Sequence, residues 1–299
     1  MKQTIIFTIL LAGLFQSAAG QDFKQQFDDL CKKKDTAGEE KLLAQWQDKK
    51  PNDPELYVAY YNFYVQKSMK EMIGLEQQQK GENSLELKDS AGKVAGYMND
   101  MVVYDDKYLR KGFEYIDKGI AMFPNRLDMR FGKIYILGKN ENYKDFTDEI
   151  IKTIEYSNKN KNAWLWTDNK PQDEPKQFML SAIQDYILQL YDTGDDTLLD
   201  NMKGISEAVL KYYPDHVESL SDLSIVYMLN KEYDKALEQL LKAEKIAPTD
   251  CIVLNNIAEA YKRKGDNANA ITYYEKILKH GDKEAKAAAQ KQIDKLDKK

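Results

Sequence analysis

Apolar and polar positions alternate most regularly between Val217 and Gly281. The pattern in this stretch is a set of apolar or small residues, Leu220, Leu223, Tyr227, Ala236, Leu240 and Ala243, which recurs 34 positions later as Leu254, Ile257, Tyr261, Ala270, Tyr274 and Ile277. The first three residues of each set stand at i, i+3 and i+7, so they share one face of a helix. A period of this length predicts two antiparallel helices per unit, stacked as a solenoid.

Turn and stop residues fall where such a unit needs them. Pro248 cannot continue a helix, because its ring clashes with the preceding turn and it lacks a backbone donor. In the second unit Gly281 can end the helix instead. With these positions, units 217–250 and 251–284 resemble the tetratricopeptide repeat. The resemblance implies an all-α fold, a right-handed superhelical solenoid of antiparallel helix pairs that binds other proteins.

The preceding residues carry the pattern in divergent form. Helices are expected at 22–34, 39–50, 54–64, 108–123, 127–139, 143–156, 177–191 and 196–213, and a capping helix at 283–297. The first domain would then cover residues 21–157, and the second would cover residues 176–299.

A small β-hairpin is predicted inside the first domain, at residues 84–98. Asp89 can start its turn and Gly92 can accept a positive φ. The apolar side chains expected on one face of the hairpin are Leu85, Leu87, Val94 and Met98. The insertion is either a structured loop without function or an elaboration used in binding.

Residues 158–175 are expected to form a polar linker loop between the two domains. The loop contains Trp164 and Trp166, which are costly to leave in water. Either this segment folds back on the helices, which is the more common outcome, or it is a second-choice site for a partner.

The first 20 residues predict a secretory signal peptide. Lys2 precedes an apolar run too short to span a membrane, and small residues at Ala18 and Gly20 allow cleavage before Gln21. Because Gln21 is not a cysteine, no lipid anchor is expected. We therefore expect an exported chain, periplasmic or secreted, without stable membrane insertion.

Composition narrows the class of partner. Lys and Arg number 44 against 49 Asp and Glu, a formal charge of −5 that is too mild and too mixed to predict nucleic-acid binding. The only two cysteines, Cys31 and Cys251, lie several units apart, so we expect unpaired, largely buried thiols.

No sequence motif predicts catalysis. The two histidines, His216 and His280, stand at the ends of separate units, and the sequence lacks the motifs of zinc, phosphate-binding or nucleophilic sites. We expect no enzyme activity, no cofactor and no metal site.

The resemblance implies that partner residues come from the second, fifth, ninth and twelfth places of each unit, on its first helix. From the residues in those places, the candidate set is Phe131, Tyr135, Ser221, Ile225, Met228, Asn255, Glu259 and Lys262. Ile252 also holds such a place. Asn255 and Lys262 form a fragment of the Lys and Asn set with which relatives clamp a carboxylate tail.

Two functions remain open. The first is a scaffold or adaptor that binds a segment of another protein in its groove. The alternative is a structural subunit of a cell-envelope assembly or a homo-oligomer, docking through the hairpin or the tryptophan loop.

Overall fold

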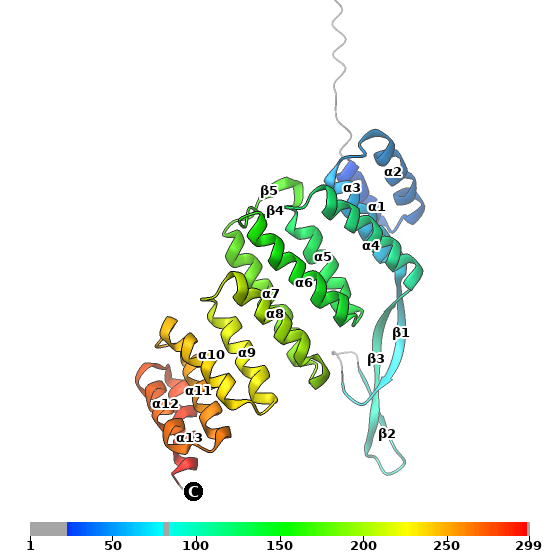
Figure 1. Cartoon of the computed structure of the whole chain (residues 1–299). Coiled ribbons are helices and arrows are strands. Elements are labelled where there is room, and N and C mark those ends of the chain that lie inside the picture. Colours follow the sequence, from blue (N-terminus) through cyan, green and yellow to red (C-terminus); the bar gives the residue numbers. More distant parts are fainter. Residues whose placement is uncertain (1–22, 80–83, 298–299) are drawn as a thin grey trace, which may run out of the picture.

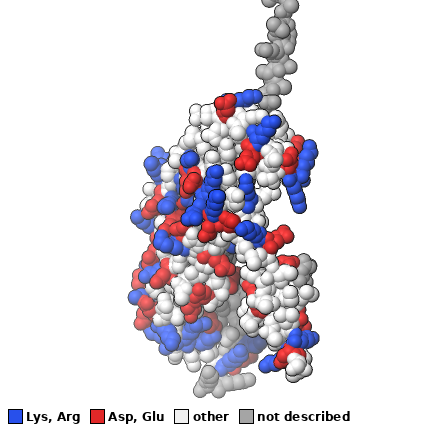
Figure 2. Space-filling view, turned by 90° about the vertical axis from the view of Figure 1, so that its right-hand side faces the viewer, with Lys and Arg blue, Asp and Glu red and all other residues white. Residues whose placement is uncertain are grey.

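The computed structural model describes residues 23–79 and 84–297, which form thirteen α-helices and two small β-sheets. Figure 1 shows the helices stacked in pairs from α1 at one end to α13 at the other, with a sheet projecting beside them. Basic and acidic side chains are interspersed over the helices in Figure 2. The predicted all-α solenoid is therefore confirmed, and the predicted signal peptide lies outside the described residues.

The first half contains six helices. They are α1 (Phe23–Lys33), α2 (Thr36–Lys49), α3 (Pro54–Ser68), α4 (Asp106–Met122), α5 (Leu127–Lys139) and α6 (Tyr143–Lys159). Aspartates begin several of them, since a carboxylate can accept a hydrogen bond from a free backbone N–H of the first turn. Asp53 does so for α3 and Asp105 for α4.

Helix α4 packs against α3 although more than thirty residues separate them in sequence. Two glycines allow the contact, because a Cβ at Gly119 would lie 2.9 Å from Cβ of Tyr57 and one at Gly112 would lie 3.4 Å from Cβ of Tyr64. The α3–α4 pair is thus closed like the later pairs, and the residues between the two helices are left to form a separate element.

That element is a three-stranded antiparallel sheet, larger than the predicted hairpin. It contains β1 (Met69–Glu76), β2 (Leu85–Lys88) and β3 (Val94–Tyr104) in the order β1-β3-β2. We refer to these three strands as the sheet arm. The hairpin prediction covered β2 and the start of β3, where Leu85 lies opposite Met98, but it missed β1.

The second half continues the stack. Its helices are α7 (Pro175–Asp192), α8 (Leu199–Tyr212), α9 (Val217–Leu229), α10 (Tyr233–Ile246), α11 (Cys251–Lys264), α12 (Asn267–His280) and α13 (Lys283–Leu296). A short 3-10 turn, η2 (Asp196–Leu198), precedes α8. Small residues again lie at the closest helix contacts, and Ala236, Ala243 and Ala270 are completely buried.

The expected linker loop is packed onto the helices. It forms β4 (Leu165–Trp166), the turn η1 (Thr167–Asn169) and β5 (Lys170–Pro171). One hydrophobic core extends from Leu127 in α5 to Val226 in α9 and includes Trp164. The packing of the helices is therefore continuous across this loop.

Both cysteines are free, but they are partly exposed rather than largely buried as expected. Cys31 lies near the end of α1, and Cys251 is the first residue of α11, where only part of each side chain is covered. Burial raises the pKa of the Cys31 thiol to about 11, with Glu39 adding to the shift.

The repeat assignment predicts a large effect of Leu223→Ala. Leu223 is buried in α9, so we expect truncation to lower the free energy of unfolding by about 2 to 5 kcal/mol. Urea denaturation followed by circular dichroism measures this value. A loss below about 0.5 kcal/mol, typical of exposed sites, would contradict the assignment.

Candidate protein-binding site

The first helices of the pairs share one surface of the stack. Helix α7 packs on α9, and α9 packs on α11. Helix α5 joins this row through Phe131, whose ring centroid lies 5.8 Å from that of Tyr186 in α7. Side chains exposed on these four helices therefore lie on neighbouring parts of the molecule.

Several of those exposed side chains are apolar. Ile252 in α11 is 70% exposed, Tyr135 in α5 is 55% exposed, and Leu188 and Tyr191 in α7 are exposed as well. We call these four residues, together with half-buried Ile225 in α9 and exposed Asn255 in α11, the first-helix surface. Within this surface, three of the four helices, α5, α7 and α11, thus expose large apolar side chains, and α9 adds one that is half-buried.

The structure separates the predicted site residues into two groups. Tyr135, Asn255, Ile225, Glu259 and Lys262 are exposed or half-buried. Phe131, Ser221 and Met228 are buried, so they cannot contact a partner without rearrangement.

The prediction that Met228 faces a groove was wrong. Met228 belongs to the core formed with Leu237 of α10 and Val253 of α11. Ile225 packs partly against the same core. The cause is that neighbouring helices bury α9 on most of its sides, including its polar residues Ser219, Ser221, Asp222 and Ser224.

Lys262, which with Asn255 is a fragment of the Lys and Asn set of carboxylate-clamping relatives, already has a partner within the chain. Lys262 forms an ion pair with Glu259, which also accepts a hydrogen bond from the Tyr274 hydroxyl at 2.6 Å. Burial alone would raise the pKa of Glu259, but these two hydrogen bonds outweigh it and lower the pKa. The ammonium of Lys262 therefore already has a carboxylate partner within its own repeat.

The tryptophan loop is part of the packing. Trp164 is 1% exposed, and its ring lies 5.7 Å from that of Tyr156 and 5.9 Å from the Arg130 guanidinium. The ring of Trp166 is half-buried against Phe178, 5.3 Å away. Trp164 is therefore inaccessible to a partner, which removes it from the second-choice site.

Sequence reasoning missed Leu188 and Tyr191. The exposed residues of α7 include Phe178, Ser181, Asp185 and Leu188, at spacings of three and four that mark one face of a helix. That pattern is visible in the sequence, but the repeat register slips in this helix, so matching by the 34-residue offset did not find it.

A buried carboxyl lies between α7 and α9. Asp222 is 4% exposed, and its Oδ1 accepts a hydrogen bond of 3.0 Å from Nε2 of Gln184. Oδ2 of Asp222 and Oε1 of Gln184 are both buried without a partner in the described part of the chain. Burial raises the pKa of Asp222 to about 7, and a proton on Oδ2 would give it the donor that Gln184 can accept.

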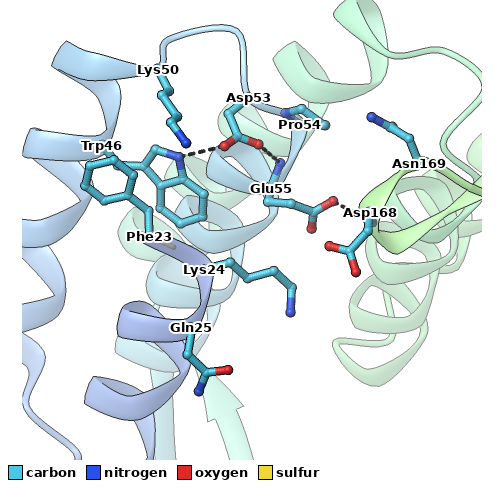
Figure 3. A pocket seen from close by; sticks show the side chains of 10 residues that line it. All are labelled: Phe23, Lys24, Gln25, Trp46, Lys50, Asp53, Pro54, Glu55, Asp168 and Asn169. Atoms are coloured by element: carbon cyan, nitrogen blue, oxygen red, sulfur yellow. Dashed lines mark hydrogen bonds between the residues drawn. The ribbon is translucent and has the colours of Figure 1, made fainter. Parts of the chain in front are cut away.

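A polar cavity of about 350 Å³ lies where α1, α2 and α3 meet the loop at residues 168–169. Figure 3 shows Lys24, Glu55 and Asp168 directed toward it. Glu55 Oε1 accepts the backbone N–H of Asp168 at 2.9 Å and lies 2.7 Å from Nη1 of Arg126. The Glu55 carboxylate is therefore already paired with groups of the same chain.

Arg126 connects three parts of the chain at this cavity. It is 1% exposed, and besides Glu55 of α3 it binds Asp128 of α5, with Nη2 2.7 Å from Oδ2, and the Asn169 side chain of the loop at 3.3 Å. Burial alone would lower the pKa of Arg126, but the two carboxylates outweigh it and raise the pKa. The network fixes the loop to the first helix pairs.

The described residues contain neither a metal site nor a membrane span. No three of their His, Cys, Asp and Glu side chains are grouped so that they could hold a metal ion. None of the helices in residues 23–79 and 84–297 has both the length and the apolar character needed to cross a membrane.

Comparison with known proteins agrees with the helix-pair geometry. A family model of the tetratricopeptide repeat matches residues 253–279, which lie in α11 and α12. The chain therefore contains a tetratricopeptide repeat. Repeats of this kind are generally non-enzymatic, and the match supports a protein–protein interaction scaffold.

One curated relative of this repeat protein is a TPR repeat-containing protein of Methanocaldococcus jannaschii. It is 24% identical over 212 residues, which cover 64% of this chain and 37% of the relative. This chain therefore spans little more than a third of the length of that relative.

Three solved structures match most of this chain at low sequence identity. YrrB, described as a TPR protein with an unusual peptide-binding site, is 13% identical, with 83% of this chain and 97% of YrrB covered and a TM-score of 0.40. The C-terminal part of a TPR repeat-containing protein from Cytophaga hutchinsonii is 16% identical, with coverages of 92% and 95% and a TM-score of 0.41. The type IV pilus biogenesis factor PilW is 10% identical, with coverages of 89% and 96% and a TM-score of 0.38.

Asp222→Asn is predicted to change how stability depends on pH. The pKa of Asp222 is raised from its ordinary 3.8 to about 7. The contribution of the protonated carboxyl to the free energy of unfolding is therefore fully present below pH 4 and is lost as the pH rises through about 7. Asparagine can bind both groups of Gln184 at any pH. We expect the variant to be more stable than the wild type at pH 7.5, by about 1 to 3 kcal/mol, and not at pH 4.

Urea denaturation at the two pH values measures this difference. Asp185→Asn, an exposed change on the same helix α7, serves as the control and should have little effect at either pH. A constant difference between wild type and Asp222→Asn across the pH range would show that Asp222 does not titrate in this interval.

Arg126→Ala is predicted to be strongly destabilising, because it leaves two carboxylates at a buried position without their cation. We expect a loss of about 3 to 5 kcal/mol in the free energy of unfolding. Arg110→Ala, at an exposed position of α4, should cost less than about 0.5 kcal/mol. Equal effects of the two substitutions in urea denaturation would contradict the assigned role of the network.

Proposed function

We propose that this repeat protein is an exported scaffold that holds a segment of another protein along the first-helix surface. One observation carries the proposal: three of the four first helices, α5, α7 and α11, expose large apolar side chains, Tyr135, Leu188, Tyr191 and Ile252, although each helix has a well-packed opposite side. Adjacent exposed apolar groups mark binding surfaces more often than isolated ones do.

The chemistry of the surface favours a partner segment with apolar side chains and a polar backbone or flanks. Asn255 offers an amide next to Ile252, and Asp185 lies one turn before Leu188 in α7. Such a mixture suits an extended or helical peptide that places its apolar side chains between polar contacts. The four first helices α5, α7, α9 and α11, side by side, form a surface long enough to contact several residues of a bound segment.

Photo-crosslinking tests the location of the partner. A photoreactive phenylalanine analogue replaces Ile252 or Leu188, and irradiation of intact cells should give a defined covalent adduct with a second protein. The same analogue at Lys242, exposed on the second helix α10, is the control and should give none. Adducts at position 242 alone would place the partner on the other side of the stack.

Glutamate substitutions test the energetics at the same surface. Leu188→Glu together with Ile252→Glu should weaken capture of the crosslinked partner by about tenfold or more, because truncating or charging an apolar contact at an interface centre typically costs over 1 kcal/mol. Both residues are exposed, so the melting temperature should change little. Full binding by a well-folded double variant would contradict the proposed surface.

The proposed export depends on the apolar segment before Gln21. Mass spectrometry of the protein recovered from the cell envelope or the medium should find Gln21 as the first residue, since small residues precede it at both required places. Retention of residues before Gln21, or an attached lipid, would contradict this part of the proposal.

A further inference from the structure

The sheet arm carries the densest group of exposed apolar side chains in the described residues. They are Met69, Met72, Ile73, Leu75, Leu85, Val94 and Val102. Leu75 is 74% exposed and Ile73 is 65% exposed. In Figure 2 the arm is a protrusion with few charges at the lower right, in contrast to the mixed charges on the helices. Such a group requires an explanation that the first-helix surface does not supply.

Strand β1 forms an open edge of this arm. It pairs with β3 on one side over all eight of its residues, and it is the last strand of the sheet on the other side. The outer side therefore presents a row of backbone N–H and C=O groups to any strand that approaches. Long, apolar edge strands of this kind readily pair with another chain.

The sequence of β1 is complementary to itself. When two copies pair antiparallel about a two-fold axis at Ile73, Ile73 faces Ile73 of the other copy, and Lys70 faces Glu76. The symmetry repeats the Lys70–Glu76 pair on both sides of the axis. Opposite charges directly across from each other stabilise antiparallel strands.

Other symmetric registers lack this match. The axis runs perpendicular to the joined sheet, so only registers centred on a residue keep the two faces of the sheet consistent. Centring on Met72 places Lys70 opposite Gly74, and centring on Gly74 places Glu76 opposite Met72. Only the register at Ile73 sets the lysine of β1 against a carboxylate.

We propose that β1 is a dimerisation strand, which joins the arms of two copies of this chain into one six-stranded antiparallel sheet. The apolar face that carries Ile73, Leu75 and Leu85 then continues across both copies. This inference rests on the arm alone and does not require the function proposed for the first helices.

The present contacts of the two charged residues are compatible with this pairing. Lys70 Nζ lies 2.8 Å from Oδ2 of Asp105, and the Lys70 side chain is still 60% exposed. Glu76 accepts a hydrogen bond from Nδ2 of Asn99 through Oε2 at 2.6 Å. The Lys70 ammonium has three donors, so it can bind a further acceptor.

Sedimentation equilibrium of the purified chain tests the proposal. We expect a monomer–dimer equilibrium with a dissociation constant on the order of 10 µM, in the range of small interfaces. Lys70→Glu should weaken the dimer by about tenfold, because it places two acidic groups opposite each other at two symmetric positions. Glu76→Lys should do the same. The double variant Lys70→Glu/Glu76→Lys restores opposite charges and should dimerise nearly as well as the wild type.

Two controls separate pairing from folding. Asp105→Asn removes the ion pair of Lys70 within the chain, but asparagine still caps α4, so the dimer should persist. Lys88→Glu in β2 changes a charge on the same arm, away from the β1 edge, and should also leave the dimer intact. Circular dichroism melting of each variant verifies that the arm and helices remain folded.

The proposal is overturned by a chain that remains monomeric at about 100 µM, ten times the expected dissociation constant. In that case the open edge is left for a strand of a different protein. It is equally overturned if both single charge reversals dimerise like the wild type, or if the double variant fails to restore the dimer while remaining folded. Leu188→Glu with Ile252→Glu should leave dimerisation unchanged, so failure of the first-helix proposal can be distinguished from failure of this one.

Discussion

Close approach of neighbouring helices at small residues is the contact on which the rest of this structure depends. A single helix pair cannot bury its own apolar face, so each pair must pack on the next. Gly119 against Tyr57 allows α4 to pack closely on α3 within one pair, and the second helices of two later pairs carry completely buried alanines, Ala236 and Ala270. The pairs stack so that the first helices α7, α9 and α11 lie beside one another and share a surface.

The same contact explains why the chain can carry an insertion as large as the sheet arm. Helices α3 and α4 pack on each other without any contribution from the residues between them, so those residues are free to form strands. The arm then extends from the end of α3 beside the stack, where Figure 1 shows it. A three-stranded sheet is thereby added without a change in the helix pairs.

Features set by local sequence were predictable. The helix at Leu127–Lys139 was predicted with the bounds that the structure has, and the clear repeats with their turns were as well, because periodicity and stop residues act within one or two turns. Strand β1 was not predictable in this way, since no turn residue separates it from α3 and its pairing with β3 joins residues about thirty positions apart. The candidate site failed at Met228 for a related reason, because neighbouring helices bury both apolar and small polar residues of α9, so its sequence does not indicate which side stays exposed.

The buried polar groups also lay beyond what the sequence could indicate. Arg126 binds carboxylates of Glu55 and Asp128, and nothing in the spacing of these residues predicts that α3, α5 and the loop meet there. Trp164 was expected in a polar loop, where either packing or binding was possible. Its contacts with the Arg130 guanidinium and the ring of Tyr156 show that Trp164 packs against the helices.

Hydroxyl-radical footprinting of the chain, alone and in complex with the partner identified by photo-crosslinking, tests the central claim most directly. The account predicts that Tyr135, Leu188, Tyr191 and Ile252 lose reactivity on binding, while Met122, an exposed residue on the second helix α4, keeps its reactivity. If these four side chains remain as reactive as in the free chain while the partner is bound, the first helices are not the binding surface.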